Sequence, residues 1–239
     1  MDWPTVILIA GAWLLWALVA HALMNNPRRD AVYGLGLVVV RAYARLMHRL
    51  EIRGTQNIPS IGNSASLVVM VNHTAGVDPV LVQAACPFEV RWMMAKDMML
   101  PALNGWWKWL EVIPVERAAD GVAGSDPTAA REALRHLQAG GIVGVFPEGG
   151  IERPPRTLRP FMPGVGLLVK RARARVLPII IEGTPLGESA WDSLLKRSHS
   201  RLTILPVVEP PAGKRGAEDL TRDLFDLYAR STGWPTRRP

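Results

Sequence analysis

A histidine and an aspartate stand at the most informative point of the sequence. The apolar run SLVVMV at 66–71 has the composition of a buried strand and leads directly into NHTAGVD at 72–78. His73 and Asp78 lie five residues apart, and a strand end that turns into a helix can bring their side chains together. Asp78 would then fix the tautomer of the imidazole, and His73 would take a proton from a hydroxyl nucleophile. A histidine near a strand end is more often structural, so the pair gains weight only from the segments that follow.

Those segments occur in a recognisable order: VIPVER at 112–117, FPEG at 146–149, FMPGVG at 161–166 and VLPIII at 176–181. With them the chain resembles the glycerolipid acyltransferase family typified by 1-acylglycerol-3-phosphate acyltransferase. NHTAGVD matches the NHxxxxD block of that family, VIPVER matches its second block, and VLPIII matches its proline-containing fourth block. FPEG matches the first half of its FPEGTR block. The resemblance covers about residues 50–210, and four blocks in order are specific.

The resemblance implies transfer of a fatty acyl group from a thioester, acyl-CoA or acyl carrier protein (acyl-ACP), to the hydroxyl of a lysophospholipid such as 1-acylglycerol-3-phosphate. It implies His73 as general base and Asp78 as its orienting partner. It also implies that Arg117, Glu148 and Gly149 bind the acceptor or shape the site. A thioester is already activated, so the reaction needs a base and positioning rather than an enzyme nucleophile. No metal and no covalent cofactor are implied.

The sequence departs from the family pattern directly after FPEG. Gly150 and Ile151 stand where the family has Thr-Arg, and that arginine would bind an acceptor phosphate through its guanidinium fork. Arg153 lies two residues further on and is the predicted replacement, with Arg156 and Arg159 close behind. Two alternatives remain open at this point. The acceptor can lack a phosphate, or the protein can be a lipid-binding relative with weak or no catalysis.

The pattern along the chain from about residue 50 predicts an α/β fold with a mostly parallel central sheet flanked by helices. Continuous apolar runs predict strands that are covered on both faces, and helical stretches lie between them. The predicted strands are 66–71, 89–94, 112–115, 141–146, 176–181 and 202–207. The predicted helices are 77–85, 128–139, 164–174 and 217–231, the second of them capped by Asp126 or Ser125.

The amino terminus carries an uncharged run, VILIAGAWLLWALVAHALM, at 6–24. As a helix it would be about 28 Å long, close to the thickness of a bilayer core. A buried core helix would usually show a polar stripe, and a cleaved signal peptide would need basic residues before the apolar run, although Ala20-His21-Ala22 resembles a cleavage site. Arginines follow the run instead, which predicts a single uncleaved span with the remaining chain on the cytoplasmic face.

A second helical stretch is expected at 31–50, where Arg41, Arg45 and Arg49 recur at four-residue spacing on one helix face. This face can be solvated above the domain, or it can lie on an anionic membrane surface. The sequence thus divides into a membrane anchor at 1–27, an amphipathic helix at 28–50 and an acyltransferase domain at 51–239.

Charge and cysteine content bound the classes of partner. The net charge of +7 suits nucleic acid, anionic lipid or phosphorylated substrates, and one cysteine rules out a disulfide framework. The sequence holds no zinc finger or basic recognition helix, so membrane lipids and the acyl donor, rather than nucleic acid, are the expected partners. It makes no prediction of oligomeric state.

Overall fold

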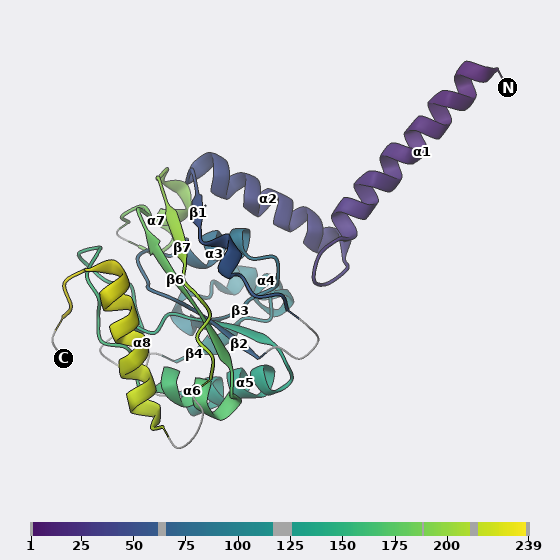
Figure 1. Cartoon of the computed structure of the whole chain (residues 1–239). Helices are drawn as coiled ribbons and strands as arrows, with labels where there is room; N and C mark the ends of the chain where they lie inside the picture. The colour runs from purple at the N-terminus through teal and green to yellow at the C-terminus, as the bar shows by residue number, and fades with distance from the viewer. Residues whose placement is uncertain (1, 62–65, 117–125, 188, 211–214, 238–239) are drawn as a thin grey trace.

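The chain folds around one twisted sheet in a computed structural model that describes residues 2–61, 66–116, 126–187, 189–210 and 215–237 (Figure 1). The described residues form seven strands in the order β1-β7-β6-β2-β5-β3-β4. Neighbouring strands are parallel except for β6 and β7, which are antiparallel. The α/β class with a mostly parallel sheet is therefore confirmed. The strands are β1 Glu51–Arg53, β2 Leu67–Val71, β3 Arg91–Ala95, β4 Ile113–Val115, β5 Ile142–Val145, β6 Arg175–Glu182 and β7 Arg201–Ile204.

Helices cover both faces of the sheet, which explains the unbroken apolar run of β2. Val68 and Met70 point into one core with α5, α6 and α8, while Leu67, Val69 and Val71 point into a second core with α2 and α3. A strand with two buried faces needs apolar residues at every position. The helices are α2 Ala31–Met47, α3 Asp78–Ala85, α4 Asn104–Trp109, α5 Pro127–Gln138, α6 Gly164–Ala172, α7 Asp192–Leu195 and α8 Ala217–Thr232.

The ends of the elements follow local chemistry. Asp126 caps α5, because its carboxylate accepts hydrogen bonds from the N–H groups of Thr128 and Ala129. All strands predicted from apolar runs are present, with boundaries shifted by up to three residues. Strand β1 lay outside the prediction because its three residues are exposed and carry no apolar run.

The amino-terminal helix α1, Trp3–Met24, projects from the rest of the chain (Figure 1). Among the described residues it is the one helix long and apolar enough to cross a membrane, with a mean hydropathy of 2.2 and none of that window buried. This property rests on length and composition, which a membrane span and a signal sequence share.

Helix α2 has an apolar surface on two sides. Tyr33, Leu37 and Ala44 are buried against the domain, whereas Val39 and Leu46 are 58% and 75% exposed. The helix ends at Met47, and the backbone of Arg49 takes a left-handed φ of 41°. The expectation that Arg49 continues the face of Arg41 and Arg45 is therefore wrong, because the N–H of Leu50 turns back to the carbonyl of Ala44. The Arg49 side chain reaches another part of the protein.

Candidate active site

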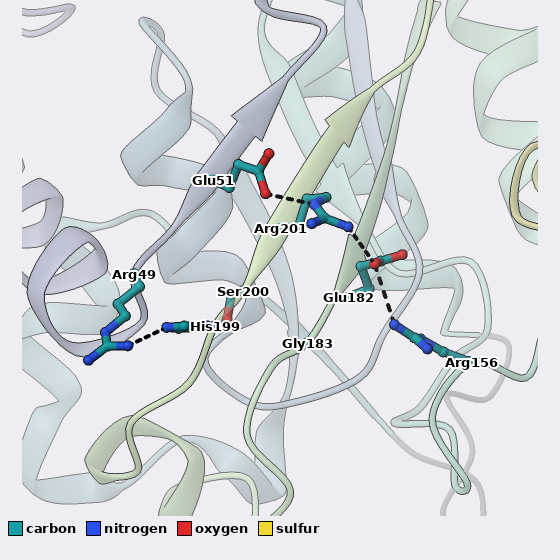
Figure 2. Close-up of a pocket in the computed structure, with 8 residues that line it drawn as sticks. All are labelled: Arg49, Glu51, Arg156, Glu182, Gly183, His199, Ser200 and Arg201. Atoms are coloured by element: carbon teal, nitrogen blue, oxygen red, sulfur yellow. Dashed lines mark hydrogen bonds and ion pairs between the residues drawn. The ribbon is translucent and has the colours of Figure 1, made fainter.

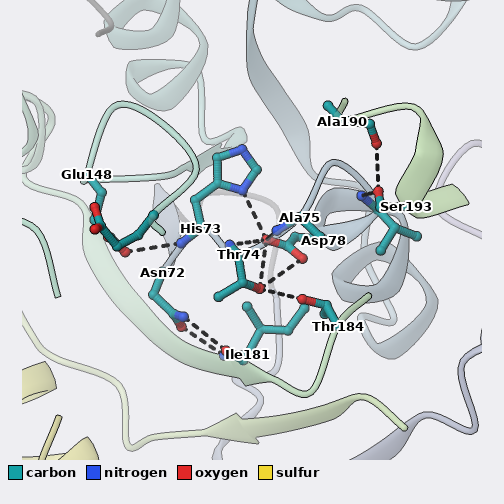
Figure 3. A network of polar contacts seen from close by, with 12 residues as sticks. Asn72, His73, Thr74, Ala75, Asp78, Glu148, Ile181, Thr184, Ala190 and Ser193 are labelled. Carbon is teal, nitrogen blue, oxygen red and sulfur yellow. Dashed lines mark hydrogen bonds and ion pairs between the residues drawn. The ribbon is translucent and has the colours of Figure 1, made fainter. Parts of the chain in front are cut away.

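Asn72 directly follows β2, and its side chain continues the pairing with the neighbouring strand β6. Its Nδ2 donates to the carbonyl oxygen of Ile181 at 2.9 Å, and its Oδ1 accepts from the N–H of Ile181 at 2.8 Å. The side-chain amide takes the place of a backbone pair, since unpaired buried backbone groups cost free energy. The main chain can therefore turn toward α3, which leaves His73 at the carboxyl edge of the sheet (Figure 3). Ligand sites of open α/β sheets lie at this edge.

The structure brings His73 and Asp78 together as the motif predicted. Nδ1 of His73 lies 2.9 Å from Oδ2 of Asp78, a residue in the first turn of α3 whose side chain is fully buried. The same oxygen accepts from the N–H groups of Thr74 at 2.7 Å and Ala75 at 2.9 Å. Oδ2 is thus the acceptor of two main-chain hydrogen bonds, and it is placed to accept a third from the imidazole. The proton on the imidazole is therefore assigned to Nδ1, and Nε2 is left as the base.

Aromatic rings hold the imidazole on one side. The ring of Phe146 stacks on His73 with centroids 3.9 Å apart and planes 18° apart. Trp92 stacks on Phe146 in turn, with centroids 5.2 Å apart. This stack fixes the plane of the imidazole and excludes water from one of its faces. No sequence pattern predicted this stack beyond the place of Phe146 in the FPEG block.

Glu148 binds the backbone of the histidine rather than its ring. Its Oε1 accepts from the N–H of His73 at 3.1 Å, and its Oε2 lies 3.4 Å from the N–H of Arg159. Burial raises the pKa of the Glu148 carboxyl to about 8, although both N–H donors oppose the rise. Gly149 follows with a φ of 72°, a left-handed conformation that glycine adopts without the strain of a side chain. Glu148 and Gly149 thus lie under the site and shape its loop.

Arg153 lies next to the turn that carries His73 and Asp78, and its guanidinium donates to main-chain oxygens. Its Nη1 donates to the carbonyl of Thr74 at 2.6 Å and to that of Glu152 at 3.0 Å. The N–H of Glu152 donates to the carbonyl of His73 at 3.0 Å, so this loop and the NHTAGVD turn are tied together twice. Arg117, the other cation expected at the acceptor, lies outside the described residues.

A comparison with known families now places the chain. A family model described as Acyltransferase matches residues 49–182, more than half of the sequence. The chain belongs to the acyltransferase family. Its fold is similar to the crystal structure of the 1-acyl-sn-glycerophosphate (LPA) acyltransferase PlsC from Thermotoga maritima, with a TM-score of 0.65. The two are 20% identical over 94% of this chain and 88% of that chain, a level at which the likeness concerns the fold. No curated protein matches the sequence significantly.

Every candidate site residue lies inside the region that the family model matches, but a residue outside that region contacts the loop after FPEG. Glu152 is buried between Arg159 and Arg237, and the Nε atom of each arginine lies 2.9 Å from one of its carboxylate oxygens. Arg237 also donates to the carbonyl of Arg153. Sequence reasoning missed this clamp, because no local pattern links a carboxylate after FPEG to an arginine near the end of the chain.

The chain after β6 contacts the NHTAGVD turn through Thr184 and through Ser193 of α7. The hydroxyl oxygens of Thr184 and Thr74 lie 2.7 Å apart, and the hydroxyl of Ser193 accepts from the N–H of Val77 at 2.9 Å. A side chain at Gly76 would place its Cβ 2.3 Å from the carbonyl oxygen of Ala190, so this close approach requires glycine. The turn that carries His73 is therefore fixed from two sides.

Other chemistries find little support among the described residues. They contain no group of three or more His, Cys, Asp or Glu side chains that could hold a metal ion. Burial raises the pKa of the Cys86 thiol to about 12, which leaves it protonated and inert as a nucleophile. The arrangement best suited to chemistry is the imidazole of His73 on the buried carboxylate of Asp78.

Proposed function

We propose that this acyltransferase moves a fatty acyl group from acyl-CoA or acyl-ACP to the hydroxyl of a lysophospholipid at a membrane. The observation that carries the proposal is the His73–Asp78 pair, with Nδ1 of the imidazole on a buried carboxylate and Nε2 left as base. A histidine in this form can activate a hydroxyl without any covalent enzyme intermediate.

The proposed reaction follows from that geometry. Nε2 of His73 takes the proton of the acceptor hydroxyl while the oxygen of that hydroxyl attacks the thioester carbonyl. Asp78 stabilises the imidazolium that forms. The tetrahedral intermediate collapses with cleavage of the carbon–sulfur bond. The imidazolium then returns the proton to the departing thiolate, so an ester and a free thiol are the products. This sequence needs no metal and no covalent cofactor.

We propose 1-acylglycerol-3-phosphate as the acceptor. The motif order supports it, and so does the fold shared with an enzyme whose name specifies 1-acyl-sn-glycerophosphate. Arg153 and Arg117 are the proposed phosphate ligands. In the described part of the chain, Nη1 of Arg153 makes its hydrogen bonds to main-chain oxygens, which leaves Nη2 and Nε for a phosphate.

The same proposal places the enzyme on the cytoplasmic face of a membrane, with α1 as an uncleaved span. The uncharged helix α1 and the arginines that follow it support this orientation. The exposed apolar side of α2 would lie at the bilayer surface, next to the lipid substrates.

One assay separates this function from its alternatives. Purified full-length protein in mixed micelles receives labelled acyl-CoA or acyl-ACP and a panel of lysolipids with and without a terminal phosphate, and mass spectrometry identifies the product. We expect an acylated product with 1-acylglycerol-3-phosphate. If product forms only with acceptors that lack the phosphate, the proposed acceptor is wrong and the reaction class stands. If lysolipid binds and no product forms, the protein is the non-catalytic lipid-binding relative that the missing family arginine suggests.

A further inference from the structure

A basic pocket lies at the edge of the sheet where β6 ends and β1 and β7 begin (Figure 2). Its volume is about 320 Å³. The wall is built from segments far apart in the sequence: Arg49, Glu51, Arg156, Glu182, Gly183, His199, Ser200 and Arg201. The pocket thus brings three guanidinium groups to one place but only two carboxylates.

Two of the three arginines share those carboxylates. Arg201 lies between Glu51 at 2.8 Å and Glu182 at 3.2 Å, and Glu51 also pairs with Arg53 at 2.7 Å. Arg156 shares Glu182 through a longer contact of 3.6 Å. One oxygen of Glu182 therefore serves two arginines, which leaves positive charge unbalanced on the side of Arg156.

The third arginine pairs with a histidine rather than with a carboxylate. Nη1 of Arg49 lies 2.6 Å from Nε2 of His199, and a guanidinium can only donate. Nε2 of the imidazole is therefore the acceptor, and this contact brings no carboxylate charge to Arg49. Within the part of the chain that the structure describes, Arg49 makes no ion pair with a carboxylate. The pocket has a net positive charge that an anionic ligand would balance.

The pocket is joined to the loops that hold His73. Glu182 and Gly183 run directly into Thr184, whose hydroxyl meets that of Thr74. Arg156 belongs to the loop that follows FPEG. Neighbouring strands lie about 4.8 Å apart, and β6, β7 and β1 succeed one another to the side of β2. The centre of the pocket is therefore displaced from β2 by roughly 10 Å across the sheet, and it lies further along β6 than the end of β2.

This separation decides which substrate can reach the pocket. The hydroxyl and the phosphate of 1-acylglycerol-3-phosphate are only a few bonds apart, so a hydroxyl placed at His73 keeps its own phosphate close to the catalytic pair. The thioester donor differs, because its reacting sulfur is joined to the first phosphate by the long pantetheine arm. Acyl-CoA and acyl-ACP share this arm and its phosphate.

We propose that the pocket around Arg49 and Arg156 binds the phosphate at the end of the donor's pantetheine arm. The inference rests on the proposed function and extends it by giving the donor a binding site separate from that of the acceptor. The thioester would lie at His73 while the arm runs across the ends of β6 and β7. A charged hydrogen bond from a guanidinium to phosphate is the interaction that holds it.

The test compares donors that differ only in phosphate. Full-length wild-type protein and the variant Arg49→Gln/Arg156→Gln receive the same acyl chain on CoA, on 4′-phosphopantetheine and on pantetheine, with the acceptor saturating. We expect the variant to raise KM for the first two donors by about tenfold or more and to leave KM for acyl-pantetheine near the wild-type value. Arg230→Gln, an exposed arginine on α8, is the matched control and should change none of the three.

Other outcomes overturn the proposal. An equal rise in KM for all three donors would show that the substitutions disturb the loops rather than a phosphate contact. A rise in KM for the acceptor alone, or weaker binding to vesicles that contain phosphatidylglycerol with unchanged donor KM, would assign the pocket to a lipid phosphate.

Failure of the proposed function has a different signature. If the wild-type protein turns over none of the donors, the transfer reaction is wrong. Calorimetric binding of CoA itself then still tests the pocket, and the double variant should bind CoA at least tenfold more weakly. CoA that binds wild type and variant equally would overturn the pocket assignment independently of turnover.

Discussion

The predicted tautomer of His73, with its proton on Nδ1, depends on the hydrogen bonds that the buried carboxylate of Asp78 accepts. Oδ2 of Asp78 accepts hydrogen bonds from the imidazole and from two main-chain N–H groups. The main-chain donors hold this oxygen in place whether or not the imidazole is charged. The position of the proton on Nδ1 is therefore a property of the turn as well as of the pair.

His73→Ala should lower kcat by about 10²- to 10⁴-fold, the usual contribution of a general base. Asp78→Asn should cost less. The N–H groups of Thr74 and Ala75 require an oxygen at the Oδ2 position, so the asparagine amide keeps its oxygen toward His73 and preserves the tautomer. Only the charge is lost, which corresponds to about 10- to 150-fold. Single-turnover kinetics of both variants provide the measurement, with circular dichroism as a check on folding.

The control for these variants is His136→Ala, at a histidine in α5 on the far side of the sheet from α3. More than a tenth of normal kcat in His73→Ala would reject the general-base role. Equal losses in His73→Ala and Asp78→Asn would reject the orientation argued for the amide.

Phe146→Leu tests the stacked ring. The π face of Phe146 favours the imidazolium over the neutral ring, and cation–π contacts contribute about 0.5–2 kcal/mol. The leucine variant should lose about 2- to 30-fold in kcat, as measured in single turnovers at one pH. Phe146→Tyr keeps an aromatic ring and should retain most of the wild-type rate. Equal losses in the leucine and tyrosine variants would contradict a role of the ring face.

Sequence reasoning found the residues whose partners are close along the chain. His73 and Asp78 share one turn, so their spacing predicted their contact. The stack of Trp92 on Phe146 and the clamp of Arg237 on Glu152 join positions from different elements, and each depends on strand order and register. These quantities follow from the packing of the whole sheet and have no local signature.

At the level of elements, the predicted strands and helices are those with a strong apolar period or run. Strands β2 and β5 lie inside the sheet, so burial on both faces made them visible. Strand β1 is stabilised by its parallel pairing with β7, because its own three side chains are exposed. Helix α4 has no buried residue. Elements that are stabilised by neighbours therefore escaped prediction, although β1 forms one wall of the basic pocket.

The loop after β5 makes stability depend on pH through Glu148. Burial raises the pKa of this carboxyl from its ordinary 4.5 to about 8 in the folded chain. Between these values the folded state holds a proton that the unfolded state releases. The free energy of unfolding should therefore fall as pH rises from about 4.5 to 8, by at most about 1.4 kcal/mol per pH unit from this group.

Glu148→Gln should remove that part of the slope, because the amide does not titrate. Denaturant unfolding of both proteins at intervals from pH 5 to 8 gives the comparison. Glu218→Gln, at an exposed glutamate of α8, is the control and should follow the wild-type curve. Parallel curves for wild type and Glu148→Gln would contradict the raised pKa.

Across the whole molecule, α2 links the apolar helix α1 to the basic pocket. This helix begins beside α1 and ends near Arg49 at the basic pocket. Its inner side packs on α3, the helix that carries Asp78. A bilayer against its outer side would therefore bring lipid acceptors toward the edge of the sheet that holds His73.

Leu35→Gln/Leu46→Gln tests this arrangement in the full-length protein. Both side chains are exposed, at 54% and 75%, so their replacement should change the free energy of unfolding by only about 0.5 kcal/mol. The protein should stay in the membrane pellet after carbonate washing, because the proposed span α1 is unchanged in the variant. Turnover of acceptor embedded in vesicles should fall several-fold, because α2 binds the interface less strongly without these two leucines. Burying one leucine side chain completely contributes at most about 1.5–3 kcal/mol. Turnover of the same acceptor dispersed in detergent should remain at the wild-type level. Thr232→Gln at the end of α8 is the control, and equal losses in vesicles and detergent would show that α2 acts through the fold rather than through the membrane.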